Sequence, residues 1–252
     1  MNKISPNGKI SFKGNLGAEV STLFPELTNN SIEKLNQIGF PNRKTEDWRY
    51  TRTSPLLKKT YQKAGASDEL QLNYPLLEQI KCPTLVIENG EINSNLSNTD
   101  HQNGLKICKF EDLNPKDSKK ISTISSPYEH AFSLLNISHL QNGVFIQIGK
   151  KVVLDSPLHL VFVNSFNNVF SNTRLFIDVE DFAEVKVVLS FVNSSEQDSF
   201  TNHVTEAELG VNSSLNIEKI QDVKGESHIC SEFIKQHAHS TFSCLLYTSD
   251  AA

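Results

Sequence analysis

The feature that most constrains this chain is a long succession of strand-like segments after Gly143. They are rich in β-branched and aromatic residues, and Ser-, Asn- and Asp-rich turns separate them. The segments are 144–148, 158–163, 174–179, 184–192, 203–209, 213–220 and 228–234. The segments form two alternating series, and within each series successive segments begin about 25–30 residues apart. This period is typical of stacked repeats. This period predicts a parallel β-helix with two strands per turn. It also fits a β-sandwich built of hairpins, although no Asn-Gly or Asp-Gly turn lies between the segments.

The sequence ahead of Gly143 shows mostly helical patterns instead of successive strands. Residues 31–39 predict a short helix whose C-terminus is capped by Gly39. Ser126-Pro127-Tyr128-Glu129 is a capping box with proline at the first helical position, and it predicts the clearest helix of the chain, 127–139. Other predicted elements are a helix around 70–80 and strands at 84–88 and 105–110.

These patterns divide the chain into regions. We expect a mostly helical region over 1–80 and a mixed α/β connecting region over 81–142. A partial parallel β-helix is expected over 143–243. The predicted fold class is therefore mainly β with N-terminal helices.

Composition limits the possible partners. Hydrophobic residues make up 38% of the 252, including 15 Phe, so a sizeable core can form. A net charge of -5 with mixed signs gives no basic footprint for nucleic acid and no polybasic patch for a membrane. No apolar run approaches the ~20 residues that span a bilayer, and residues 1–14 lack a signal-peptide core. We therefore expect a cytoplasmic protein.

Cysteine and histidine give only weak candidates for metal ligands. The four cysteines, Cys82, Cys108, Cys230 and Cys244, are far apart, so each is interpreted as a small buried or half-buried apolar residue. His237 and His239 would share one face of a strand, and Cys230 or His228 from a neighbouring coil could add a ligand. Ordinary histidines on an exposed strand face are the favoured interpretation.

The remaining polar groups are also interpreted as structural. Trp48 is expected to pack the N-terminal region, with Glu46, Asp47 and Arg49 in solvent. Arg174 opens a strand, and Asp178 or Glu180 could pair with it. Glu206 and Glu208 alternate along a strand, which fits a solvated sheet face better than acid–base work.

Three segments carry a resemblance to a known family. Residues 39–51 read G-F-P-N-R-K-T-E-D-W-R-Y-T and resemble the G-(L/F)-P-x-R-(K/R)-x-E-(D/N)-W-(K/R)-Y-T stretch of SufD proteins. Residues 131–146 are similar to A-L-N-T-A-F-x-x-D-G-V-x-I, with Ile137-Ser138-His139 in place of Thr-Ala-Phe. Residues 172–179 resemble the family's P-R-x-x-I-x-V strand, with Thr173 in place of proline, and 202–206 resemble N-x-V-T-E. Over about positions 16–243 the chain resembles the SufB/SufD family, and SufD more than SufB.

This resemblance implies a right-handed parallel β-helix, the SufBD core, behind the helical region. In that family SufB and SufD pair through their β-helices, and each binds the ATPase SufC through a C-terminal helical segment. The implied function is a non-catalytic scaffold subunit of the SufB–SufC–SufD complex that supports cluster assembly and iron acquisition. Neither catalytic nor cofactor-binding residues are expected here, because the assembled complex would handle the Fe–S cluster. The absence of a P-loop motif suits a partner of an ATPase.

The last residues depart from the resemblance. The family continues through more coils and then the SufC-binding helices, whereas residues 244–252 read C-L-L-Y-T-S-D-A-A. We expect 244–252 to be a non-biological tail, the β-helix to be incomplete at its C-terminal end, and the SufC-binding segment to be missing.

Two enzyme classes compete with this interpretation. A β-helix carbohydrate-active enzyme would carry clustered Asp, Arg or Lys on one sheet, and such enzymes are commonly secreted. A left-handed β-helix acyltransferase would need hexapeptide repeats, and the strand spacing here is too long for them. We keep the carbohydrate-active enzyme as the alternative.

Overall fold

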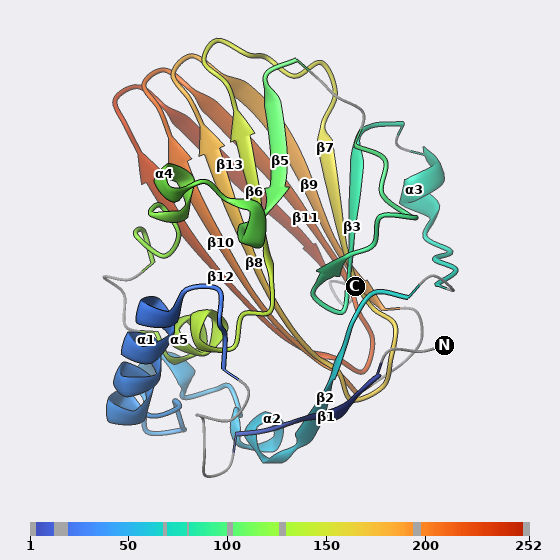
Figure 1. Cartoon of the computed structure of the whole chain (residues 1–252), viewed down its shortest axis with the longest axis vertical. Helices are drawn as coiled ribbons and strands as arrows, with labels where there is room; N and C mark the ends of the chain where they lie inside the picture. The colour runs from blue at the N-terminus through green and yellow to red at the C-terminus, as the bar shows by residue number, and fades with distance from the viewer. Residues whose placement is uncertain are drawn as a thin grey trace.

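The computed structural model describes residues 4–12, 20–67, 70–79, 81–99, 103–125, 130–193 and 198–248. Two sheets dominate it (Figure 1). The five-stranded sheet has the order β12 (Ser227–Gln236), β10 (Phe200–Leu209), β8 (Phe170–Val179), β6 (Gly143–Ile148) and β5 (Leu105–Lys109). The six-stranded sheet has the order β13 (Thr241–Thr248), β11 (Ser214–Asp222), β9 (Glu184–Asn193), β7 (Leu158–Asn164), β3 (Thr84–Glu88) and β4 (Glu91–Ile92).

The chain alternates between the two sheets from β6 onward. Even-numbered strands join the five-stranded sheet and odd-numbered strands join the six-stranded sheet. The pairs β6–β8, β8–β10 and β10–β12 are parallel, as are β7–β9, β9–β11 and β11–β13. This is a parallel β-solenoid with two strands per coil, so the predicted β-helix is confirmed. The hairpin sandwich is wrong, because its consecutive strands would pair antiparallel.

One turn recurs in every coil and explains the repeat in the sequence. Lys151, Phe182, Asn212 and His239 occupy successive copies of it, with φ values of 63°, 59°, 55° and 58°. Backbone hydrogen bonds stack the copies, since Phe182 N donates to Val211 O and Asn212 N donates to Ala238 O, at 3.0 and 3.1 Å. The left-handed residue breaks the alternation of a strand and starts the path to the other sheet.

Inward-facing apolar side chains of both sheets fill the centre of the solenoid. The five-stranded sheet contributes Leu175, Ile177 and Ala207, and the six-stranded sheet contributes Val187 and Ile217, all fully buried. Equivalent aromatic residues stack from coil to coil, as Phe162 and Phe191 do with ring centroids 4.9 Å apart. The sequence shows period-two alternation because each strand places every second residue in this core.

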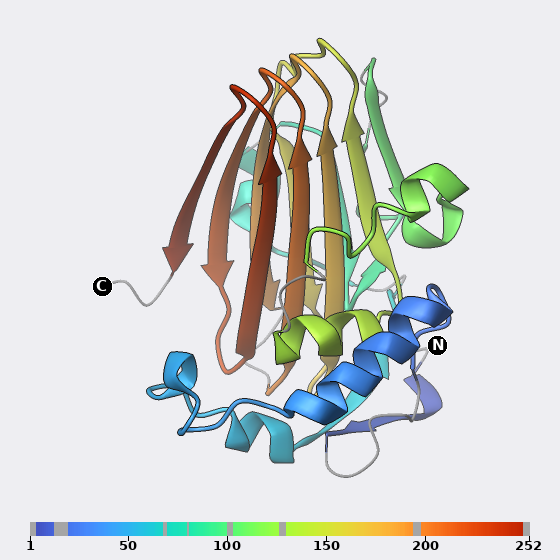
Figure 2. The ribbon, with the colours of Figure 1, turned by 90° about the vertical axis from the view of Figure 1, so that its left-hand side faces the viewer.

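Helices and loops cover parts of the outer faces. The remaining elements are β1 (Ile4–Ser11), α1 (Pro25–Ile38), η1 (Glu46–Trp48), α2 (Ser54–Lys58), β2 (Thr60–Ala64), α3 (Pro75–Gln79), η2 (Phe110–Asp112), α4 (Pro115–Ser118) and α5 (Ala131–Ser138). Helices α1 and α5 pack together at one end of the sheets, and α5 contacts β8 and β10 (Figure 2). Their apolar side chains join Tyr61, Phe170 and Phe200 in a second core.

Several predicted elements can be compared with the structure. The helix expected at 31–39 begins earlier, at Pro25, and Gly39 ends it with φ 68° and ψ 179°, a backbone region reserved for glycine. The capping box Ser126–Glu129 lies outside the described residues, and α5 is seen from Ala131 to Ser138. The region expected to be mostly helical also contains the antiparallel pair β1–β2.

The region boundaries themselves remain a prediction. Strand β3 pairs in parallel with β7, and β5 pairs with β6, so both sheets begin ahead of residue 143. At the other end, β13 pairs with β11 in register from Thr241↔Ser214 to Thr248↔Gln221. The segment expected to be a tail is therefore in a strand as far as Thr248, and 249–252 lie outside the described residues. In the part of the chain that the structure describes, no helix is long and apolar enough to cross a membrane.

Candidate functional site

The solenoid interior changes from apolar to polar along its strands. The inward positions of β10 read Thr201, His203, Thr205, Ala207 and Leu209, so that strand is polar at its start and apolar at its end. The register places His203 beside Cys230 of β12 and Thr201 beside His228. Chemically reactive side chains therefore gather at the polar end of the interior.

Cys230 lies at the centre of this cluster. Lys219 reaches it from β11 in the opposite sheet, with Nζ 3.0 Å from Sγ. Lys219 also forms an ion pair with Glu232, whose Oε1 is 4.0 Å from the same sulfur. Burial alone would raise the pKa of the Cys230 thiol, but His228 and the charge of Lys219 outweigh burial, so this pKa is lowered. The thiolate form of Cys230 is therefore more accessible than that of an unperturbed cysteine.

His228 is two residues away on the same strand and faces the same interior. Its side chain is 6% exposed, and its Nδ1 lies 3.7 Å from Oε1 of Glu226. Burial alone would lower the pKa of His228, but its interactions with Cys230 and Glu226 outweigh burial and raise it. Asn164 holds Glu226 in place by donating from Nδ2 to Oε2 at 2.8 Å. Cys230 thus has two basic neighbours, one from each sheet.

His203 is a different kind of histidine. Its ring is fully buried, with Nδ1 2.7 Å from Thr173 Oγ1 and Nε2 2.9 Å from Thr205 Oγ1. The edges of Phe162 and Phe191 also contact it. Burial lowers the pKa of His203 well below its ordinary value, so the ring stays neutral. It is a structural member of the cluster and lies beside Cys230 in the sheet register.

This arrangement favours thiolate chemistry over metal binding. Within the described residues, no group of three or more His, Cys, Asp or Glu side chains is placed to hold a metal ion. An ammonium 3.0 Å from the sulfur also opposes a nearby metal cation. A thiol whose pKa is lowered by a neighbouring ammonium group gains nucleophilic character instead.

His237 and His239, the weak metal candidates, are not where the sequence placed them. β12 ends at Gln236, and both residues belong to the recurring turn, with φ 58° at His239. The expectation of two rings on one strand face is therefore wrong, because the left-handed residue breaks the alternation. His237 Nε2 lies 3.1 Å from Glu208 Oε1 on the outer surface, whereas His228 and Cys230 face the interior. The structure does not bring the two pairs together.

Arg174 is buried as an ion pair, but with a different partner from those expected. Its Nη2 pairs with Glu206 of β10, its Nη1 donates to Asn136 Oδ1 at 2.9 Å, and Nη2 also donates to Ser125 Oγ at 2.6 Å. Asp178 lies four residues along the same strand, about 13 Å away at the rise of a β-strand. Glu206 comes from the neighbouring strand and is closer. The expected solvated face is wrong for Glu206, which is fully buried.

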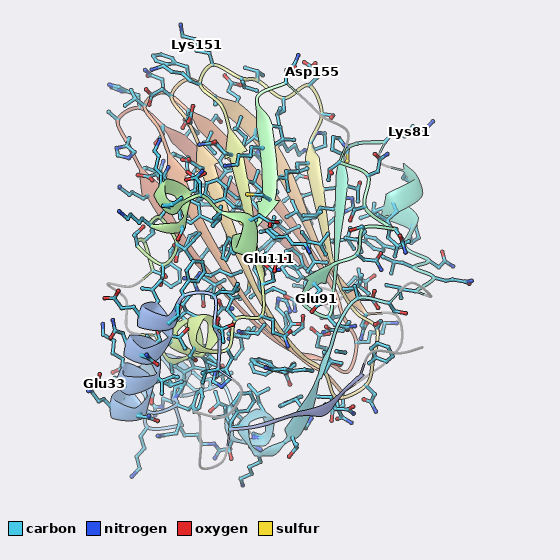
Figure 3. All side chains as sticks on the ribbon, viewed as in Figure 1. Glu33, Lys81, Glu91, Glu111, Lys151 and Asp155 are labelled. Atoms are coloured by element: carbon cyan, nitrogen blue, oxygen red, sulfur yellow. The ribbon has the colours of Figure 1, made fainter. Side chains whose placement is uncertain are left out.

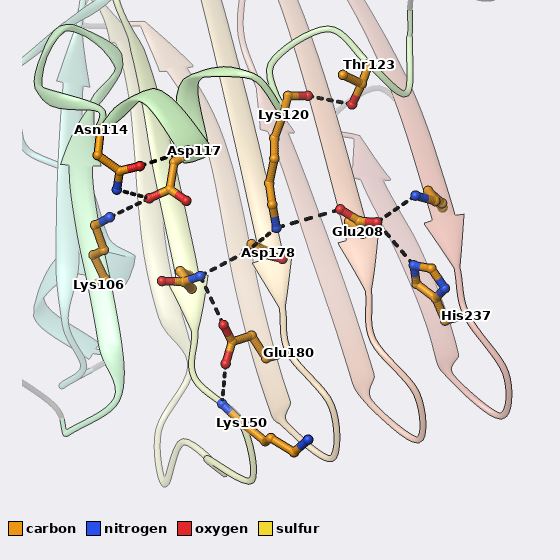
Figure 4. A network of polar contacts seen from close by, with 12 residues as sticks. Lys106, Asn114, Asp117, Lys120, Thr123, Lys150, Asp178, Glu180, Glu208 and His237 are labelled. Atoms are coloured by element: carbon orange, nitrogen blue, oxygen red, sulfur yellow. Dashed lines mark hydrogen bonds and ion pairs between the residues drawn. The ribbon is translucent and has the colours of Figure 1, made fainter.

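The outer face of the five-stranded sheet carries a network of charges (Figure 4). Asp178 and Glu208 are direct neighbours in register, and Lys120 bridges them, with Nζ 2.7 Å from Asp178 Oδ2 and 3.7 Å from Glu208 Oε2. Lys235 and His237 hold the other oxygen of Glu208. These carboxylates are used in ion pairs. Other charged side chains, Glu33, Lys81, Lys151 and Asp155, lie at the periphery (Figure 3).

Trp48 packs as the sequence predicted. Its ring lies 5.1 Å from that of Phe132, and Glu46, Asp47 and Arg49 are exposed. The Gly39–Thr51 motif also lines a hollow of about 340 Å³ against Ile229 and Ser231 on the outer side of β12. The motif therefore joins the N-terminal region to the solenoid.

From the sequence, Cys230 and His228 were only possible additional metal ligands, and the cluster around Cys230 was not predicted. The alternation of His228, Cys230 and Glu232 was visible and would have placed them on one strand face. It could not show that this face is the interior, nor that Lys219 of the opposite sheet reaches the thiol.

Comparison with known proteins agrees with this architecture. The SufBD protein N-terminal region matches residues 12–160, and the SufBD core domain of the SUF system for FeS cluster assembly matches 161–251. An iron–sulfur cluster assembly SufBD family protein of Synechocystis sp. is 25% identical over 232 residues, 84% of this chain and 51% of the relative. Protein ABCI7, chloroplastic, of Arabidopsis thaliana is 23% identical over 246 residues, 92% of this chain and 52% of the relative. The chain thus spans about half the length of these curated relatives. With both regions matched in order over nearly its whole length, the chain belongs to the SufBD family of iron–sulfur cluster assembly proteins.

Proposed function

We propose that this chain acts as a non-catalytic scaffold subunit of a SufB–SufC–SufD complex, on the SufD side. The observation that carries the proposal is the unbroken parallel pairing from β6 to β13, a stiff platform with an interior closed by packed side chains. Such a platform suits the β-helix pairing with a SufB-like partner that the family resemblance implies. The family match over both regions supports the same role.

The partners follow from this role. A SufB-like solenoid would bind this chain directly, and a SufC-like ATPase would join through the segment that family members carry behind the solenoid. The Fe–S cluster is cargo of the assembled complex. A cytoplasmic location belongs to the same proposal, whereas the Arabidopsis relative is named chloroplastic.

The carboxylates of the structure do not favour a carbohydrate-active enzyme. Glycoside hydrolysis needs two carboxyl groups free to act on either side of the substrate. Glu206 is committed to Arg174, and Asp178 to Lys120, with Glu206 fully buried. This favours the scaffold.

Co-purification tests the proposal. The full reading frame that contains this chain would be co-expressed with a tagged SufB-like protein and a SufC-like ATPase, with an unrelated parallel β-solenoid protein as the control. We expect the chain, but not the control, to co-elute with both partners in fixed ratio. Failure to co-elute with the SufB-like protein, when the chain itself is folded by circular dichroism, would contradict the proposal.

A further inference from the structure

We propose that Cys230 is an oxidation site at which hydrogen peroxide converts the thiolate to a sulfenic acid. The site consists of Cys230, Lys219, His228 and Glu226 at the polar end of the solenoid interior. It is independent of the scaffold proposal, since it requires only the fold of this chain.

The first argument is the position of the ammonium group. Lys219 Nζ lies 3.0 Å from Cys230 Sγ and is itself nearly buried. At that distance in a partly dehydrated interior, a positive charge stabilises a thiolate far more than it does in water. The thiolate, and not the thiol, is the form that attacks an electrophile.

The second argument is the buried imidazole. Nδ1 of His228 makes no hydrogen bond, and its nearest carboxylate oxygen, Oε1 of Glu226, is 3.7 Å away. A buried polar atom without a partner is costly unless a small polar molecule can satisfy it. Its interactions with Cys230 and Glu226 raise the pKa of His228, so the ring is a better proton carrier near neutral pH than an unperturbed histidine. A proton source therefore lies beside the nucleophile.

The reaction balances with these groups. The thiolate sulfur attacks one oxygen of H2O2, an S–O bond forms, and the O–O bond breaks. The sulfur is oxidised and the peroxide is reduced. The departing hydroxide takes a proton from the His228 imidazolium and leaves as water. Cys230 is then a neutral sulfenic acid, and Lys219 keeps only Glu232 as a charged partner.

Size favours peroxide over larger electrophiles. Cys230 is partly buried between two sheets, so small reagents reach it more readily than bulky ones. Cys82 and Cys108 have the same intermediate exposure, but burial raises the pKa of each thiol. They serve as internal controls that are also half-buried but whose thiol pKa values are raised.

The groups that face Cys230 determine how its reaction depends on pH. They are Lys219 from β11, His203 from β10, and His228 and Glu232 from β12, with Glu226 ahead of that strand. Because the pKa of Cys230 is lowered, its oxidation rate should rise at a lower pH than the rates at Cys82 and Cys108, whose thiol pKa values burial raises.

The experiment treats the full chain with hydrogen peroxide, traps sulfenic acid with dimedone, and measures the labelled fraction of each cysteine by peptide mass spectrometry. We expect labelling at Cys230 at least about 10-fold faster than at Cys82 and Cys108 at neutral pH. Lys219→Gln should slow it several-fold, and Lys219→Arg should restore it if charge is what matters. Lys219→Arg keeps the positive charge, so it remains informative if Lys219→Gln does not fold by circular dichroism.

Two outcomes would overturn the proposal. One is equal labelling of Cys82, Cys108 and Cys230 in the folded protein. The other is a rate at Cys230 that rises over the same pH range as the rates at the two control cysteines.

Discussion

Arg174 and Glu206 form an ion pair across neighbouring parallel strands, and their side chains are only 1% and 0% exposed. Both lie on the outer face of the five-stranded sheet, where α5 and the segment ending at Ser125 cover them. A buried charge that loses its partner is expensive, because water cannot replace it. This pair therefore ties the helical cover to the solenoid.

We predict that Arg174→Met destabilises the fold by about 3–5 kcal/mol, because it leaves the carboxylate of Glu206 buried without a partner. The free energy of unfolding would be measured by urea titration. The double variant R174M/E206L should recover most of the loss, since it removes both charges. Lys235→Ala is the control. It breaks an exposed pair with Glu208 at 2.7 Å and should cost less than ~1 kcal/mol. An Arg174→Met loss no larger than that of the control would contradict the prediction.

Asn136 is predicted to be a second anchor of the same cover. From α5 its Nδ2 donates to the backbone oxygens of Thr173 and Asn202, at 2.9 and 3.0 Å, and so contacts two coils. Asn136→Ala leaves both acceptors and an Arg174 donor without partners, so we expect a loss of about 2–4 kcal/mol in a urea titration.

The matched control for Asn136 is Asn36→Ala on the exposed face of α1, which should stay within ~0.5 kcal/mol. Similar values for the two variants would show that the buried hydrogen bonds of Asn136 are not needed for stability.

Acid should destabilise the protein through buried neutral histidines. Burial lowers the pKa of His139, with Lys63 as a further cause, and burial lowers that of His159, each to about 4. In the unfolded chain both titrate near 6.5. Between these values the unfolded state binds more protons, so stability is fully present above pH 6.5 and falls as the pH drops towards 4. His228 has the opposite effect on stability. Because its folded-state pKa is raised, its contribution to stability is present at low pH and is lost as the pH rises through that pKa.

The measurement is the urea midpoint as a function of pH for the natural chain and for His159→Gln. Each such histidine contributes a slope of up to ~1.4 kcal/mol per pH unit within the window. The variant should therefore lose less stability between pH 6.5 and 4 than the natural chain. Parallel curves for the two proteins would rule out a contribution of His159.

The solenoid could be predicted from the sequence because its pattern is local. Each coil must place alternate residues in the core and turn at a fixed interval, so every segment from β6 to β12 shows the same alternation and spacing. The site was harder to predict, because its contacts join different coils and sheets. Lys219 and Cys230 are 11 residues apart and lie on opposite sheets, and no local pattern indicates how those sheets face each other. The pairing of Arg174 with Glu206 was missed for the same reason, since it depends on the register between β8 and β10.

The close stacking of the recurring turns gives a last prediction at Gly210, which directly follows β10. A Cβ at this position would lie 2.7 Å from Asp181 N and 2.8 Å from Glu180 C of the preceding coil, so the methyl group would meet backbone atoms that cannot rotate away. Gly210→Ala should therefore cost about 1–3 kcal/mol, because two coils must separate to admit the methyl group. Gly65→Ala is the matched control. Its Cβ would meet the carboxylate of Glu91 at 2.8 Å, the far end of a side chain that can rotate away. We expect a smaller loss for Gly65→Ala in the same urea titration. If the two variants lose equal stability, the spacing of the coils at this turn is adjustable, and the turn does not fix the solenoid repeat.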